Sequence, residues 1–263
     1  MRKLIQTGLS IALFMPAAAA AQSPFDGTWK VDIENAQLPT RPYVYVLKDG
    51  TYRCSSCLPP IEVKADGDDH KVAGNLSHDS VSIKVINDRS ITETDKKIGR
   101  TVSTETMTIS PDGATMKVGF SDHGNANAQP VTGTAVVTRI APGPAGSHAI
   151  SGSWKMSKME NVSENAEMIT FRVEAGTLHM SNPTGQSYTA KLDGTEAPFN
   201  GDPGQNIVSV KQIDKSTIEE TDKLNGKVIG VQRFEITPDG KTIHATVHDM
   251  LRNTTVTGIA TKQ

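Results

Sequence analysis

Several features are scarce or missing in this sequence, and each absence narrows what the protein can be. The 27 basic and 29 acidic residues are interspersed and leave a formal net charge of −2, which gives no electrostatic footprint for nucleic acid or an anionic membrane surface. Beyond the N-terminus, no stretch is long and apolar enough to cross a bilayer as a helix. There is no Gly-x-Ser-x-Gly nucleophile motif. The sequence therefore identifies no reaction, and no cofactor is expected.

Cysteine is also scarce. Cys54 and Cys57 are the only cysteines, and two cysteines fill half of a zinc site. In an exported protein, two thiols this close favour a local disulfide that staples a loop. A redox-active pair is the alternative, although no helix is predicted here to lower a thiol pKa. His244 and His248 lie about 13 Å apart if they share a strand, too far to hold one ion. No metal site is expected.

The N-terminus has the pattern of a secretory signal peptide. Arg2 and Lys3 precede an apolar stretch that ends in a run of alanines. This order predicts cleavage after Ala21, so that residues 1–21 are removed and the protein is periplasmic or secreted. A membrane anchor would need about 20 apolar residues, and this stretch is shorter.

The rest of the chain consists of two similar copies of one unit. Residues 81–96 match residues 208–223 at nine of sixteen positions, and other matches keep nearly the same offset. Such collinear matches indicate duplication. Between the copies, residues 142–148 are small and kinking, as in a linker. We expect one domain over 23–141 and a second over 149–263.

Within each copy the apolar residues alternate with polar ones. Val81, Ile83 and Val85 form one such series, and Asp-Gly turn dipeptides separate several others. A period of two predicts half-buried strands, and the spacing of the turns predicts about eight to ten strands per copy. No long amphipathic helix is found, so the predicted fold class is all-β, with antiparallel barrels or sandwiches.

Each copy opens with Gly-x-Trp, at Trp29 and Trp154, and closes with a strand ending in a basic residue, Arg139 or Lys262. This arrangement resembles the lipocalin-like, or calycin, β-barrels, and the whole chain is similar to a class of secreted bacterial proteins with duplicated barrels. The resemblance implies two tandem barrels in which the indole seals the closed end. A basic side chain from the last strand of the same copy would cover the indole. The shorter last strand of the second copy predicts that its barrel closes less completely.

Acidic clusters recur in both copies, at residues 93–95 and 219–222. Paired carboxylates can serve acid–base chemistry or bind a hard cation. The adjoining charged turns instead favour a solvated hairpin with cross-strand Lys–Asp pairs. We therefore expect both clusters to face solvent.

The barrel interiors are the remaining candidate for function. Few aromatic side chains are available to fill them, which leaves room for a ligand. We hypothesise an exported binding protein for a small apolar or amphipathic molecule. The alternatives are a non-catalytic structural or interaction module of the cell envelope, or a thiol-redox enzyme using Cys54 and Cys57. The aromatic residues expected to contact a ligand are Tyr43, Tyr45, Tyr52, Phe171, Tyr188 and Phe234.

Overall fold

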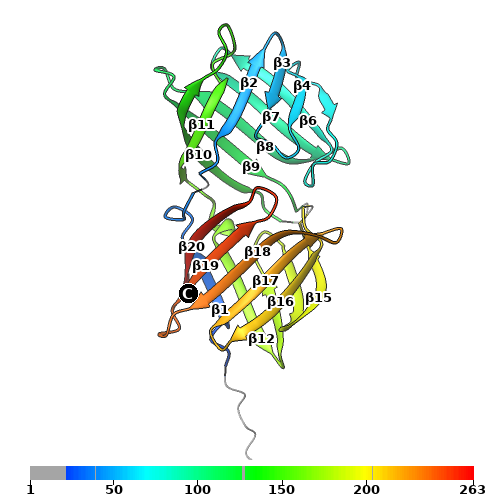
Figure 1. Cartoon of the computed structure of the whole chain (residues 1–263), viewed down its shortest axis with the longest axis vertical. Coiled ribbons are helices and arrows are strands. Elements are labelled where there is room, and N and C mark those ends of the chain that lie inside the picture. Colours follow the sequence, from blue (N-terminus) through cyan, green and yellow to red (C-terminus); the bar gives the residue numbers. More distant parts are fainter. Residues whose placement is uncertain (1–21, 39, 126–127, 203) are drawn as a thin grey trace, which may run out of the picture.

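A computed structural model describes residues 22–38, 40–125, 128–202 and 204–263. Twenty strands and one short 3-10 helix, η1 (Glu164–Ala166), account for the regular structure of these residues. The strands form two antiparallel sheets of ten strands each, and the two sheets lie end to end along the long axis of the molecule (Figure 1). The all-β prediction and the duplicated barrel architecture are confirmed.

One sheet, here called the first barrel, is nearly closed. Its two edge strands, β4 and β5, do not pair with each other, but the turn between them donates a backbone hydrogen bond from Gly67 to Ile83 of β6. The strands of the first barrel are β2 (Tyr43–Lys48), β3 (Thr51–Cys54), β4 (Ile61–Lys64), β5 (Asp69–Lys71), β6 (Ser80–Asn87), β7 (Ser90–Lys97), β8 (Arg100–Ile109), β9 (Thr115–Asp122), β10 (Val131–Pro142) and β11 (Gly152–Glu160).

The other sheet, the second barrel, closes fully, because β1 pairs with both β12 and β20. The shorter last strand of the second copy is therefore sufficient for closure, and the open seam is in the first barrel. The strands of the second barrel are β1 (Gly27–Val31), β12 (Met168–Glu174), β13 (Thr177–Ser181), β14 (Ser187–Lys191), β15 (Asp193–Asn200), β16 (Ile207–Asp214), β17 (Thr217–Leu224), β18 (Lys227–Ile236), β19 (Thr242–Asp249) and β20 (Thr254–Lys262).

The two copies exchange their first strands. β1, from the start of the chain, lies in the second barrel, whereas β11, which opens the second copy, lies between β10 and β2 of the first barrel (Figure 1). The chain crosses between barrels at residues 32–42 and 161–167. Residues 142–148, predicted to be a linker, instead extend from the end of β10 into the connection between β10 and β11. The sequence repeats and the barrels therefore do not coincide.

The exchange also changes the partners at the closed ends. The Arg139 guanidinium lies 4.0 Å from the centre of the Trp154 ring, and Lys262 Nζ lies 5.1 Å from that of Trp29. Trp29 and Trp154 are both fully buried. A cation over an indole is worth about 0.5–2 kcal/mol. The expected type of contact is present, but each basic residue covers the tryptophan of the other copy.

Alternation along the strands builds the two cores. Val81 and Ile83 of β6 point inward and are fully buried, as are their counterparts in β16, Val208 and Val210. Each barrel has its own cluster of buried apolar side chains. The same alternation carries polar residues inward farther along the strands, and those residues form the site.

Candidate functional site

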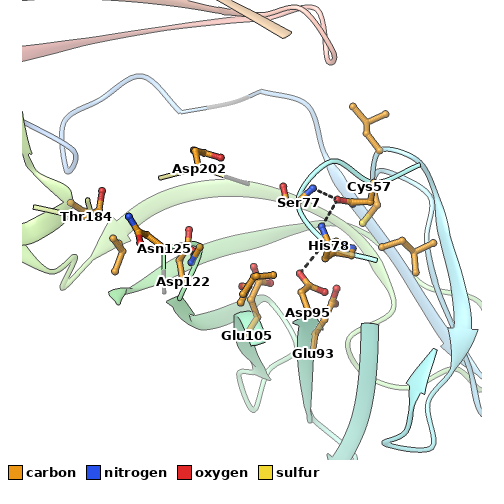
Figure 2. Close-up of a pocket in the computed structure, with 18 of the residues that line it drawn as sticks. Cys57, Ser77, His78, Glu93, Asp95, Glu105, Asp122, Asn125, Thr184 and Asp202 are labelled. Carbon is orange, nitrogen blue, oxygen red and sulfur yellow. Dashed lines mark hydrogen bonds and ion pairs between the residues drawn. The ribbon is translucent and has the colours of Figure 1, made fainter. Parts of the chain in front are cut away.

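A cavity of about 640 Å³ opens in the first barrel, at the end that faces the second. Most of its lining comes from the first barrel, from strands that include β2, β3, β7 and β8 and from the loops after β3, before β6 and after β9. Three loops of the second barrel also take part and contribute Thr184, Asp202 and Arg252. The second barrel therefore forms part of the wall, as Figure 2 shows for Thr184 and Asp202.

Three carboxyl groups lie together on the inner face of this barrel. Glu93 of β7 is directly opposite Glu105 of β8 in the strand register, and Asp95 lies two residues along β7 on the same face. Directly opposite residues have Cβ atoms about 5 Å apart, and like charges so placed destabilise a sheet. All three line the cavity and project to the same side in Figure 2. The acidic cluster at 93–95 therefore faces the interior, contrary to the expectation of a solvated hairpin.

His78 completes this group. Its Nδ1 lies 3.5 Å from Asp95 Oδ2 (Figure 2). The residue is only 8% exposed, yet His78 Nε2 and Asp95 Oδ1 have no hydrogen-bond partner among the described residues. Leaving buried polar atoms unsatisfied is costly. The loop before β6 thus holds a polar ring in the cavity wall with one nitrogen uncommitted.

Burial sets the protonation of these groups. It raises the pKa of Asp95 to about 7, with Glu105 as a further cause. Burial also raises the pKa of Glu105, and it raises that of Glu93 well above its ordinary value, assisted by Glu105 and Asp95. Burial lowers the pKa of His78, and Lys97 lowers it further. Near neutral pH the cluster is therefore only partly ionised and the imidazole is neutral.

A tyrosine wall faces the carboxyl groups. The Tyr43 and Tyr45 rings are nearly parallel, with centroids 6.4 Å apart, and Tyr52 lies 6.1 Å beyond Tyr45. The Tyr52 hydroxyl donates to Glu93 Oε2 at 2.9 Å. Burial raises the pKa of Tyr52 well above its ordinary value, so this hydroxyl remains a donor. The cavity thus has an aromatic side and an acidic side.

The second barrel has the matching positions, but two of the four side chains differ. At positions 127 residues later, Glu220 and Asp222 repeat Glu93 and Asp95, but Gln232 replaces Glu105 and Gln205 replaces His78. Both amides donate to Asp222, Gln232 Nε2 at 2.8 Å and Gln205 Nε2 at a shorter distance. Tyr188 donates to Glu220. The inward acids of the second barrel are therefore hydrogen-bonded by neutral partners.

The predicted ligand contacts divide between the barrels. Tyr43, Tyr45 and Tyr52 all line the cavity. Phe171, Tyr188 and Phe234 lie in the core of the second barrel instead. There the Phe171 and Phe234 rings are 5.9 Å apart, and Tyr188 packs against Phe199. The aromatic side chains therefore fill one barrel and line a space in the other.

Cys54 and Cys57 form a disulfide, with Cα atoms 5.4 Å apart. Cys54 is buried at the end of β3, and Cys57 lines the cavity. The bond holds the loop that carries Leu58 and Ser56 against the cavity. Its position agrees with a loop staple beside the site.

Sequence reasoning missed His78 and Glu105. The parity of the strand contained a signal for Glu105, since Met107 and Ile109 follow it at steps of two and are buried. His78 lies in a loop, where no periodicity applies.

Comparison with known proteins adds no assignment: no model of a known protein family matches the chain, and no curated protein is similar to it in sequence. Within the described part of the chain, no group of three or more His, Cys, Asp or Glu side chains is arranged to hold a metal ion. None of the described helices is long and apolar enough to cross a membrane.

Proposed function

We propose that this is an exported, lipocalin-like binding protein that holds a small amphipathic molecule inside its first barrel. The observation that carries the proposal is the cavity of about 640 Å³ with its tyrosine wall and facing polar groups. This volume lies within the range of small-molecule sites, which combine apolar walls with a few placed polar groups.

The lining favours an amphipathic ligand over a wholly apolar one. Tyr43 and Tyr45 offer aromatic surface, whereas Asp95 and His78 leave polar atoms unsatisfied. An apolar molecule would bury those atoms without partners, at a cost in affinity. A molecule with an apolar body and a polar end satisfies both sides.

The second barrel acts as structural support and as part of the wall. Its own inward acids are hydrogen-bonded and its aromatic residues pack against each other. Three of its loops also line the cavity of the first barrel. Under this proposal the second copy contributes to function by completing the wall of the ligand site.

Export is proposed from the signal-peptide pattern of residues 1–21, which lie outside the described residues. Under this proposal the disulfide forms after export. The thiol-redox alternative is less well supported, because Cys54 is buried and, among the described residues, neither cysteine begins a helix, although Cys57 lines the cavity. Reactive thiols are partly exposed and often start a helix.

The test uses 1-aminoanthracene, a neutral three-ring fluorophore with a polar end. We expect its emission to rise on binding to the folded protein at micromolar concentration. Ser103 lines the cavity on β8, so Ser103→Phe should weaken this binding at least about tenfold by filling the space. Thr104→Phe, on the outer face of the same strand, is the matched control. Equal binding by Ser103→Phe and Thr104→Phe would reject the cavity as the site, and absence of binding by both this neutral dye and a charged three-ring dye would reject the binding function.

A further inference from the structure

The duplication supplies an internal reference for the cluster at Glu93, Asp95 and Glu105. In the second barrel, the residue opposite Glu220 is Gln232, so the like-charge pair of the first barrel is absent at the matching place. One amide is enough to relieve the repulsion and to donate to the neighbouring acid. The first barrel has two opposed carboxyl groups at this place, an arrangement that destabilises a sheet. The second barrel shows that the fold also accepts a carboxyl group opposite an amide.

His78 gives an independent sign of a ligand. Its counterpart, Gln205, donates to Asp222, whereas the nine-tenths buried His78 lines the cavity with Nε2 unpartnered among the described residues. Asp95 Oδ1 is unpartnered as well. Both of these atoms can accept a hydrogen bond: a neutral imidazole accepts through one ring nitrogen, and a carboxylate accepts through both oxygens.

The formal charge of the lining is mainly negative. Arg252 is the one formally cationic side chain among the described lining residues, and its guanidinium is paired with Asp249 at 2.8 Å. The acidic lining residues are five: Glu93, Asp95, Glu105, Asp122 and Asp202. Walls of one sign and low dielectric concentrate counterions of the opposite sign.

The tyrosines provide the complementary surface. Tyr43 and Tyr45 line the same cavity with nearly parallel rings. Aromatic ring faces attract cations, and recognition of alkylated ammonium groups uses such walls. Acids and aromatic rings in one cavity are the features that bind a positively charged organic group.

We propose that the cavity of the first barrel binds an organic cation, with its charged group beside Asp95, Glu105 and His78 and its apolar body against the tyrosines. This inference rests on the proposed binding function and names its ligand class. Inorganic cations are not the expected class, since the described residues form no three-ligand metal cluster.

Protonation of the site makes binding depend on pH. The titratable groups close to Asp95 are Glu93 on β7, Glu105 on β8 and His78 before β6. Tyr52 on β3 lines the same cavity and donates to Glu93. Because the pKa of Asp95 is raised to about 7, a bound cation must displace a proton below that pH. Affinity for a cation should therefore rise as the pH increases through about 7.

The experiment compares 1-aminoanthracene with 9-aminoacridinium, which has three fused rings, stays positively charged between pH 5.5 and pH 8, and has N–H groups to donate to His78 and Asp95. We expect 9-aminoacridinium to bind at least about tenfold more tightly at pH 8 than at pH 5.5, whereas binding of the neutral dye changes less than about threefold. The variant H78Q/E105Q installs the residues of the second barrel and should weaken cation binding at least about tenfold. Q232E, in the second barrel, is the control and should leave it unchanged.

The outcomes separate the two proposals. Failure of both dyes to bind would reject the binding function itself. Binding of the neutral dye, with no preference for 9-aminoacridinium at pH 8, would reject the cation and keep the binding function. Equal loss of both dyes in H78Q/E105Q would also reject the cation, because the two side chains would then only shape the cavity. Circular dichroism of each variant establishes that it is folded, and E105Q alone serves if the double variant is not.

Discussion

Glu220→Gln in the second barrel tests the consequence of burying acids in this fold, apart from any ligand. Glu220 is 4% exposed and accepts a hydrogen bond from Tyr188. Burial raises the pKa of Glu220 to about 8, with Asp222 as a further cause. Glutamine keeps an oxygen for Tyr188 and removes the group that titrates.

The direction in which stability changes with pH follows from proton linkage. Between an unfolded pKa of 4.5 and a folded pKa of about 8, the folded protein holds a proton on Glu220 that the unfolded chain releases. Stability is therefore lost as the pH rises through this window. At pH 7 the loss is about 3 kcal/mol, at 1.36 kcal/mol per pH unit above 4.5. Glu220→Gln should recover that amount at pH 7, roughly 6–12 °C in Tm, and almost nothing at pH 4.

Urea unfolding followed by circular dichroism at pH 4 and pH 7 measures the difference. Glu219→Gln is the control, since its side chain lies on the other face of β17 and should change stability by less than about 0.5 kcal/mol. If Glu220→Gln changed stability equally at the two pH values, or lowered it at pH 7, the assignment of a buried, protonated carboxyl would be refuted.

Two further predictions concern the exchanged strands. Thr28 and Thr170 have side-chain oxygens 3.0 Å apart, so a T28C/T170C variant should form an intramolecular disulfide, seen by peptide mass mapping. S153C/T170C should form none, because β11 lies in the other barrel, and the reverse result would contradict the exchange. Gly152 and Gly27 both have positive φ, so alanine at either should cost about 1–3 kcal/mol. Thermal melts should show a larger loss of stability for Gly152→Ala than for Gly27→Ala. The new Cβ at Gly152 would lie 2.5 Å from a backbone oxygen, whereas the nearest atoms at Gly27 belong to the flexible Lys262 side chain. Equal losses would contradict this reasoning.

The sequence was sufficient to predict the class of fold. Alternation at residues such as Val81 and Ile83 determines which face of a strand is buried, and this is a local property. The tryptophan starts and basic ends also predicted the type of contact at each closed end. These features depend on short segments, which a single sequence displays directly.

The strand exchange could not be predicted from the sequence. Gly27–Trp29 and Gly152–Trp154 are nearly identical, so either segment fits either barrel and no residue pattern selects one partner. The choice depends on where the chain crosses, at residues 32–42 and 161–167. Such connections do not alter the pattern of the strands they join.

For a related reason, the sequence predicted only the aromatic half of the site. Tyr43, Tyr45 and Tyr52 were predicted as ligand contacts because they are aromatic residues in a barrel with few of them. The acids at 93–95 were assigned to solvent because charge near a turn usually faces water. The structure buries them because the strands continue past the apolar residues with the same parity. Sequence alternation identifies the inward face but not what the space inside will hold.

The differences between the copies locate the function better than their similarities. Both barrels have a Tyr–Glu hydrogen bond and a pair of inward acids. In the second barrel these acids are hydrogen-bonded to neutral side chains, so the shared features are compatible with a stable core. The first barrel differs at Glu105 and His78, where one residue adds repulsion and the other leaves a buried nitrogen unpaired. Both changes reduce stability by themselves. A positively charged ligand would reverse the sign of the first effect and lessen the second.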